Sequence, residues 1–271
     1  MHVSVTADGQ QSVRYDVEYR SGVRGSTIYL PRSPAPKPAV LLLHGSEGGF
    51  AGWSRVWALA LAQAGFVTLQ WSYSKGGSPW CAGDILEVPL DETEEALAWL
   101  RTAPGVSGRL GLYGESRGAE HGLLLTALMA RDSPGLPHAL AAHGASDTIV
   151  GAFIASAFRP DAAAKAARRG PWEGTPILLD PKCAWGWRGT SKQLLPGSPV
   201  EIERYGGPLF LSHGEKDDVW SVNRTKRLER RLRDAGRRPE VHYYPEQTHR
   251  LTPEGRKVHQ TRLVAFFRRY L

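Results

Sequence analysis

The feature that most constrains this chain is a serine flanked by glycines between an apolar strand pattern and an apolar helix pattern. A short apolar run, Leu110 to Tyr113, leads into Gly114-Glu-Ser116-Arg-Gly118, and leucines at 123, 124, 125 and 128 follow. A serine on a sharp strand-to-helix turn has a strained backbone, and the residues two before and two after it must lack side chains so that strand and helix can approach. The chain has 30 glycines, so a chance match is conceivable, but this context predicts a nucleophile elbow at Ser116.

The residues around this serine also suggest how an oxyanion is stabilised. A helix that begins directly after Ser116 directs free N–H groups and its positive dipole end at an attacked carbonyl, so we expect the N–H of Arg117 to be one donor. The second donor is expected in the glycine-rich turn His44-Gly-Ser-Glu-Gly-Gly49, which follows a continuous apolar strand pattern. Ser46 is the first candidate and Glu47 the second. The alternative is an ordinary strand-to-helix turn that uses its glycines for positive φ.

Strand and helix patterns alternate along the whole chain. This alternation predicts an α/β protein with the α/β-hydrolase fold, a mostly parallel sheet with helices on both faces. A length of 271 residues with 41% hydrophobic content suits one large core, so residues 1–271 are expected to form a single domain. The expected strands are 13–19 and 25–30, which are antiparallel, and 39–43, 65–71, 110–113, 139–142, 208–212 and 240–244; the expected helices are 53–64, 91–100, 221–235 and 253–271.

Residues 147–204 lose this periodicity and are rich in Pro, Gly, Ala and Arg. A structureless loop of that length is unusual in a compact domain, so we interpret it as a lid inserted after the sixth strand, with a helix near 161–169. Its tryptophans, Trp172, Trp185 and Trp187, form an apolar acyl pocket or simply anchor the lid, and both interpretations stay open. Its candidates for pairing with an anionic substrate group are Arg159, Arg168, Arg169 and Arg188.

Composition and charge limit the partners of the chain. No leader-like segment and no run of about 18 apolar residues is present, which predicts a soluble, cytoplasmic protein without a membrane partner. Cys81 and Cys183 have no metal-ligand spacing around them, so neither a metal nor another cofactor is expected. The net charge is +7, yet no nucleic-acid-binding motif accompanies it. The basic run 224–238 has apolar residues at helical spacing, which favours a solvated helix face over a nucleic-acid site.

An acid and a base for the serine follow later strands. Asp217 lies on the turn after the strand at 208–212, where this fold places the carboxylate that orients its histidine, and Asp218 is the fallback. His249 follows the last strand and precedes the final helix, so we expect it to be the base. The chain order Ser116, Asp217, His249 matches the order serine, acid, histidine of this fold.

Three other histidines receive supporting roles. His44 and His213 lie in His-Gly turns, where bracing a loop is the better interpretation. His121, five residues after the serine, is expected behind the site or facing the lid.

These motifs resemble one family in particular. Gly114-Glu-Ser-Arg-Gly-Ala-Glu120, the turn at 44–49, Pro208-Leu-Phe-Leu-Ser-His-Gly-Glu-Lys-Asp217 followed by Trp220, and His249 are similar to the C-terminal catalytic domain shared by acyl-CoA thioesterases and bile acid-CoA:amino acid N-acyltransferases. The resemblance runs from about Ala39 to the C-terminus and implies acyl transfer through a covalent acyl-enzyme on Ser116. Residues 1–38 are too short for the β-sandwich domain that precedes the catalytic domain in eukaryotic members. Ester or lactone cleavage, as in dienelactone hydrolases and prolyl-oligopeptidase-like esterases with the same core, therefore stays open.

The expected function is a serine hydrolase that cleaves a small-molecule ester or acyl thioester through Ser116, Asp217 and His249. One alternative is an acyltransferase that passes the acyl group to an amine or alcohol, although no amine-binding carboxylate can be placed from the sequence. Another is a catalytically inert binding protein of the same fold. Whether the chain forms a homodimer is left open.

Overall fold

A computed structural model describes residues 17–22, 26–49, 52–74, 84–154, 179–180 and 182–271. The strands of its main sheet are β1 (Val17–Ser21), β2 (Thr27–Pro31), β3 (Lys37–Leu43), β4 (Val67–Trp71), β6 (Val106–Glu115), β7 (Ala139–His143), β11 (Leu209–Gly214) and β12 (Glu240–Tyr244). The helices are α1 (Gly52–Gln63), α2 (Asp91–Thr102), α3 (Arg117–Asp132), α5 (Asn223–Asp234), α6 (Pro253–Tyr270) and the short 3₁₀ helix η3 (Ile202–Arg204). Four two-residue strands lie outside the main sheet: β5 (Val88–Pro89), β8 (Ala152–Phe153), β9 (Leu179–Asp180) and β10 (Trp185–Gly186).

The eight strands of the main sheet have the order β1-β2-β4-β3-β6-β7-β11-β12. β1 and β2 pair antiparallel with each other, β2 pairs antiparallel with β4, and the remaining pairs are parallel. The predicted α/β-hydrolase fold, with its mostly parallel sheet, is therefore confirmed. The segment predicted to follow the sixth strand does follow β7, which is sixth in chain order within this sheet.

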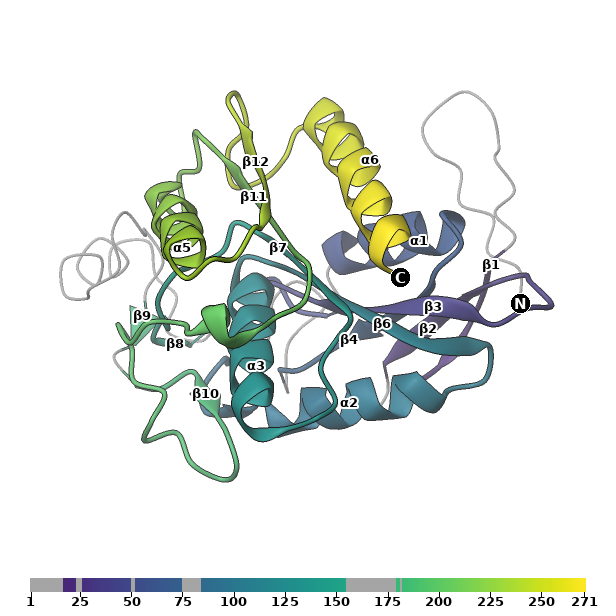
Figure 1. The fold of residues 1–271 in the computed structure, drawn as a ribbon, viewed down its shortest axis with the longest axis horizontal. Helices are drawn as coiled ribbons and strands as arrows, with labels where there is room; N and C mark the ends of the chain where they lie inside the picture. Colours follow the sequence, from purple (N-terminus) through teal and green to yellow (C-terminus); the bar gives the residue numbers. More distant parts are fainter. Residues whose placement is uncertain (1–16, 23–25, 50–51, 75–83, 155–178, 181) are drawn as a thin grey trace.

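The central strands are buried on both faces, which explains their continuous apolar runs. In β3, Ala39, Leu41 and Leu43 face one hydrophobic cluster, whereas Val40 and Leu42 face the other. This period of two is the side-chain alternation of a strand, and here both alternating sets are apolar. Helices α2, α3 and α5 contribute to the first cluster, and α1 and α6 contribute to the second (Figure 1).

The segment after residue 181 is anchored on this core by two tryptophans. Trp185 and Trp187 are fully buried, and their indole N–H groups donate to Glu120 (2.8 Å) and Asp132 (2.7 Å). For these two residues the structure supports the anchoring interpretation. Trp172 and the predicted helix at 161–169 lie outside the described residues, as do Cys81 and the start of the first predicted strand, so the lid role of 147–204 stays a prediction.

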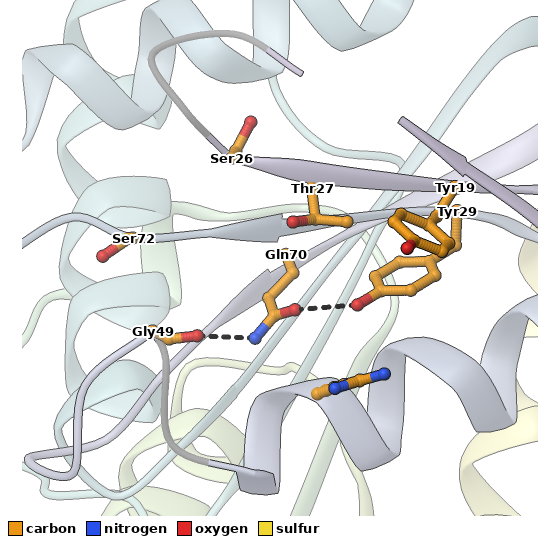
Figure 2. A pocket seen from close by; sticks show the side chains of 8 residues that line it. Tyr19, Ser26, Thr27, Tyr29, Gly49, Gln70 and Ser72 are labelled. Atoms are coloured by element: carbon orange, nitrogen blue, oxygen red, sulfur yellow. Dashed lines mark hydrogen bonds between the residues drawn. The ribbon is translucent and has the colours of Figure 1, made fainter. Parts of the chain in front are cut away.

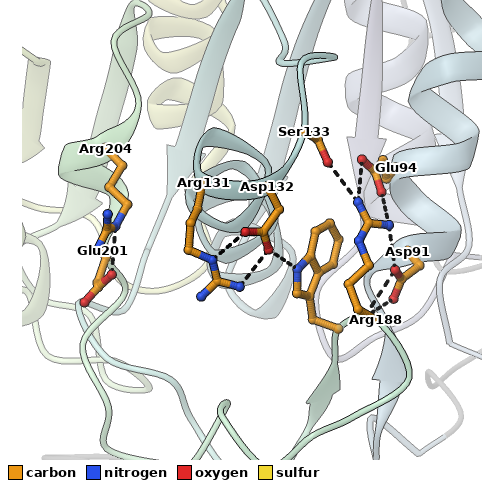
Figure 3. A network of polar contacts seen from close by, with 9 residues as sticks. Asp91, Glu94, Arg131, Asp132, Ser133, Arg188, Glu201 and Arg204 are labelled. Atoms are coloured by element: carbon orange, nitrogen blue, oxygen red, sulfur yellow. Dashed lines mark hydrogen bonds and ion pairs between the residues drawn. The ribbon is translucent and has the colours of Figure 1, made fainter.

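Arg188 has protein partners in place of a substrate. Its guanidinium pairs with Asp91 (2.9 Å) and Glu94 (2.7 Å) on α2 and donates to Ser133 (2.8 Å), as Figure 3 shows. Two carboxylates already compensate this charge, so the expectation that Arg188 pairs with an anionic substrate group is wrong. The other three candidates, Arg159, Arg168 and Arg169, lie outside the described residues.

The basic helix α5 is less solvated than the sequence suggests. Leu228 and Leu232 are buried as predicted, but Arg224 is buried too, and it donates to Ser146 (2.8 Å). Arg227 binds both carboxylate oxygens of Asp147, at 2.7 and 3.0 Å. The interpretation as a solvated face is therefore wrong for Arg224, which is buried, whereas the Arg227 side chain stays 40% exposed. Their partners lie about 80 residues away in the sequence, so the sequence of the helix does not reveal them.

A buried ion pair links the start of α3 to the Trp185 segment. Arg117 donates to Glu120 (2.9 Å), and both side chains are almost fully buried. We predict that Glu120→Gln lowers the free energy of unfolding by about 3–5 kcal/mol, because the Arg117 charge is left uncompensated in the interior. Urea unfolding of wild type and variant measures this difference.

Arg204 and Glu201 provide a matched control with the same spacing of three residues, and both side chains are exposed (Figure 3). Glu201→Gln is expected to change stability by less than about 1 kcal/mol. Equal losses in the two variants would contradict the role given to the buried pair.

Candidate active site

Ser116 lies on the tight turn that the sequence predicts. It is one of three non-glycine residues in the described chain with positive φ (54°), and its N–H donates to the carbonyl of His143 on β7 (2.9 Å). A Cβ atom on Gly118 would lie 2.5 Å from the carbonyl oxygens of Leu43 and His44. Only glycine at position 118 allows this approach of α3 to β3. The positive φ of Ser116 is the backbone conformation of a sharp turn between β6 and α3.

The loop at 44–49 is fixed at both ends by side chains of the β4 region. The hydroxyl of Tyr73 donates to the His44 carbonyl (2.8 Å), and the amide of Gln70 donates to the Gly49 carbonyl (2.6 Å). Gln70 also accepts from the Tyr29 hydroxyl (3.1 Å). Tyr29, Gly49 and Gln70 border a polar cavity of about 250 Å³ (Figure 2). A polar Gln70 within an apolar strand was the sequence signal for this brace.

Inside this loop, Glu47 folds back onto the backbone. Its carboxylate accepts from the Gly45 N–H (2.9 Å) and also contacts its own N–H. Within the described residues, the N–H groups of Ser46 and Arg117 have no acceptor. Of the two candidates for the second donor, Ser46 is therefore the one whose N–H is available.

Asp217 is held by four donors, whereas Asp218 is exposed. Asp217 Oδ1 accepts from the backbone N–H groups of Val219 and Trp220, both at 2.8 Å. Its Oδ2 accepts from His249 Nδ1 (2.8 Å) and lies 3.0 Å from His213 Nε2. Burial raises the pKa of Asp217, but the hydrogen bonds from the two histidines outweigh it and hold the pKa well below the usual value. The carboxylate is thus a buried anion aimed at His249.

The structure brings His249 and Asp217 together and places Ser116 at the same edge of the sheet. Gly144, the residue after the carbonyl that binds the Ser116 N–H, is next to the His249 ring, since a Cβ there would lie 3.6 Å from His249 Cε1. Within the part of the chain that the structure describes, no hydrogen bond joins the Ser116 hydroxyl to His249.

Two of the supporting histidines are neutral and buried. His44 stacks on Tyr73 with ring centres 3.9 Å apart, and burial lowers the pKa of His44 to about 4. His121 contacts Thr93 (2.9 Å) and packs edge-on against Trp185. Both therefore brace the site from behind.

Glu115, directly before the serine, is a site residue that the sequence reasoning did not single out. Tyr113 donates to its carboxylate (2.7 Å), and the same hydroxyl contacts His259 of α6 (2.9 Å). Burial raises the pKa of Glu115 to about 7, and the nearby Glu47 carboxylate adds to this effect. A glutamate beside the nucleophile was visible in the sequence, but its surroundings come from distant elements: Trp57 of α1 bonds to it, and His259 of α6 bonds to its partner Tyr113.

Among the described residues, no group of three or more His, Cys, Asp or Glu side chains is arranged to hold a metal ion, and Cys183 is a free thiol. No helix in the same part of the chain has both the length and the hydropathy needed to cross a membrane.

The raised pKa of Glu115 makes stability depend on pH. The fold favours the protonated carboxyl, so this stabilisation is complete below the ordinary pKa of 4.5 and is lost as the pH rises to about 7. Glutamine mimics the protonated form. We predict that Glu115→Gln gains stability relative to wild type between pH 4.5 and 7, by up to about 3 kcal/mol, in urea unfolding at a series of pH values.

Glu254→Gln, on the exposed first turn of α6, controls for the loss of a carboxylate. A difference between wild type and Glu115→Gln that does not change with pH would show that Glu115 does not titrate in this range.

Comparisons with known proteins agree with this architecture. Residues 186–271 match the model of the prolyl oligopeptidase family. The chain is 28% identical over 243 residues to acyl-coenzyme A thioesterase 6 of Mus musculus, covering 88% of this chain and 54% of that protein. It is 27% identical over 242 residues to acyl-coenzyme A thioesterase 5 of Mus musculus, with the same coverage. The chain thus spans about half the length of these curated relatives.

Two solved structures share the fold over nearly the whole chain. A putative dienelactone hydrolase from Klebsiella pneumoniae superposes with a TM-score of 0.62 at 18% identity, covering 94% of this chain and 98% of that one. Pyrococcus horikoshii acylaminoacyl peptidase superposes with a TM-score of 0.65 at 15% identity, covering 95% of this chain and 42% of that one. The chain therefore has the α/β-hydrolase fold and resembles the C-terminal domain of acyl-CoA thioesterases.

Proposed function

We propose that this protein is a serine hydrolase that cleaves an ester or acyl thioester through a covalent acyl-enzyme. The observation that carries the proposal is the hydrogen-bonded pair of His249 and the buried Asp217 beside Gly144, at the sheet edge where Ser116 lies on its strained turn. This combination of residues at this position in the fold is the arrangement used for acyl transfer.

In the proposed first step, His249 Nε2 takes the proton of the Ser116 hydroxyl as its oxygen attacks the carbonyl carbon of the substrate. The negative charge moves to the carbonyl oxygen, where the N–H groups of Ser46 and Arg117 stabilise it. Collapse of the tetrahedral intermediate breaks the bond to the leaving group, which receives the proton from His249. The acyl group is then an ester of Ser116.

In the second step, water replaces the leaving group. His249 takes a proton from the water as its oxygen attacks the acyl-enzyme carbonyl, and returns the proton to Ser116 Oγ as the free acid departs. Asp217 stays ionised throughout, because its hydrogen bonds hold its pKa well below the usual value. Its charge orients the His249 ring and stabilises the imidazolium that forms in both steps.

The proposed substrate is a small-molecule acyl ester or thioester. A CoA leaving group is suggested by the two thioesterase relatives, whereas the dienelactone hydrolase neighbour supports the fold alone. We further propose that residues 147–204 act as a lid over the acyl group. The buried Trp185 and Trp187 fix the C-terminal part of this segment to the core.

Ser116→Ala is expected to lower kcat by at least about a thousandfold on any substrate that the wild type cleaves, because the covalent route is lost. A panel of p-nitrophenyl esters and acyl-CoAs of graded chain length provides the rates. Ser33→Ala removes an exposed hydroxyl whose hydrogen bonds, among the described residues, are to Ala35 in the same loop, so it should retain the wild-type rate.

Two outcomes would contradict the proposal. Unchanged turnover in Ser116→Ala, with the fold verified by circular dichroism, would exclude Ser116 as the nucleophile. Mostly amide product from an acyl donor mixed with amino acids would show that the enzyme is an acyltransferase, since a hydrolase releases the free acid.

A further inference from the structure

A second histidine contacts the proposed catalytic acid at the same carboxylate oxygen as His249. His213, at the end of β11, has Nε2 3.0 Å from Asp217 Oδ2 and 2.9 Å from the carbonyl oxygen of Trp220. The His213 side chain is completely buried, and that of Asp217 is 1% exposed. The contact is therefore shielded from water. A hydrogen bond to a charged group is stronger in such an interior than in water.

The surrounding atoms determine the tautomer of His213. Both atoms near Nε2 are acceptors, so Nε2 must carry the proton and share it between Asp217 and the Trp220 carbonyl. Nδ1 faces the hydroxyl of Thr225 at 2.7 Å, whereas that hydroxyl is 3.3 Å from the Ala145 carbonyl. The shorter contact favours donation from Thr225 to Nδ1. The Nε2–H of His213 is thus directed at the carboxylate of Asp217.

Helix α5 holds this ring in place. Thr225 lies in its first turn, and the neighbouring Arg224 guanidinium lies 5.1 Å from the centre of the Trp220 ring. The backbone N–H of Trp220 donates to Asp217, and the backbone carbonyl of Trp220 accepts from His213. The histidine, the carboxylate and the turn between them therefore form one closed hydrogen-bonded unit that ends at His249.

We propose that His213 is a positioning residue for the reaction: its Nε2–H fixes the Asp217 carboxylate so that Oδ2 faces His249 Nδ1, and it withdraws part of the carboxylate charge from His249. This inference rests on the proposed hydrolase function. The two backbone N–H groups hold only Oδ1, so without His213 the position of Oδ2 depends on His249 alone. If His249 alone had to hold Asp217 in position, the two side chains would be less well preorganised for the reaction.

Among the described residues, a further histidine close to Asp217 is His143 on β7, which bonds to Ser212 (2.8 Å). Burial, with smaller contributions from the neighbouring histidines, holds the pKa of His143 well below the usual value, so this ring is neutral in the range in which the enzyme would work. Glu47 and Glu115 also act electrostatically on His249, and burial raises the pKa of Glu115 to about 7. The pH profiles are therefore compared in the Glu115→Gln background as well as in wild type, so that a shift present in both reports on Asp217 and His249.

Three variants separate positioning from simple packing. His213→Leu fills the space without a donor, His213→Gln returns an N–H near the Nε2 position, and Thr225→Val removes the partner that fixes the tautomer. We expect kcat to fall about tenfold to hundredfold in His213→Leu with little change in KM, since the lost hydrogen bond is to a charged group.

The acid limb of the kcat/KM profile should move to higher pH in His213→Leu, because the Asp217 carboxylate then has no hydrogen bond from His213 and attracts the proton on His249 more strongly. His213→Gln should recover most of kcat, and Thr225→Val should fall between wild type and His213→Leu.

A measurement that needs no activity accompanies the kinetics. Long-range ¹H–¹⁵N NMR of the wild-type histidine rings should show His213 protonated at Nε2 alone, and the proton between His249 and Asp217 should shift in His213→Leu. Wild-type kcat and an unmoved pH profile in His213→Leu would overturn the proposal, as would His213 protonated at Nδ1 or a glutamine variant no better than leucine. If Ser116→Ala were as active as wild type, the hydrolase function would fail, while the NMR result would still decide the role of His213 at Asp217.

Discussion

The close contact between the end of β6 and the start of α3 is the constraint on which the rest of this structure depends. Without side chains at Gly114 and Gly118, α3 approaches the carbonyl ends of β3 and β6, and Ser116 between them takes a positive φ. Its N–H then bonds to β7, which places Gly144 and hence His249 along the same edge of the sheet. A larger residue at either glycine would separate helix and sheet and move the serine away from this edge.

Buried charge is the second organising element, and it is balanced differently on the two sides of the serine. Asp217 satisfies its oxygens with four donors and stays ionised, whereas Glu115 receives too few and is favoured in its protonated form. Behind the elbow, Arg117 and Glu120 neutralise each other and tie in Trp185. One sheet edge thus holds a permanent anion beside His249 and a carboxyl that titrates near neutrality beside Ser116. The two carboxyl groups behave differently because their hydrogen-bond donors differ.

The sequence predicted what depends on local pattern. The alternation of strands and helices, the elbow at Ser116 and the turns that carry Asp217 and His249 were visible because each is encoded by neighbouring residues. The errors concern partners distant in sequence: Arg224 of α5 looks like part of a solvated face, but it is buried and bonds to Ser146. His213 was expected only to brace its turn, since nothing in its own segment shows that Asp217 points back toward it. Strand pairing and side-chain direction decide such contacts, and one sequence does not display them.

The central claim is that Ser116 is an activated nucleophile, and reaction with a fluorophosphonate tests it most directly. Attack of the Ser116 oxygen on phosphorus expels fluoride and leaves a stable phosphonate ester, which intact mass and peptide mapping locate. The account predicts one adduct per chain, on the peptide that contains Ser116, with much slower labelling when His249 is replaced by alanine. A folded wild-type protein that remains unlabelled, or that is labelled at another residue, would contradict it.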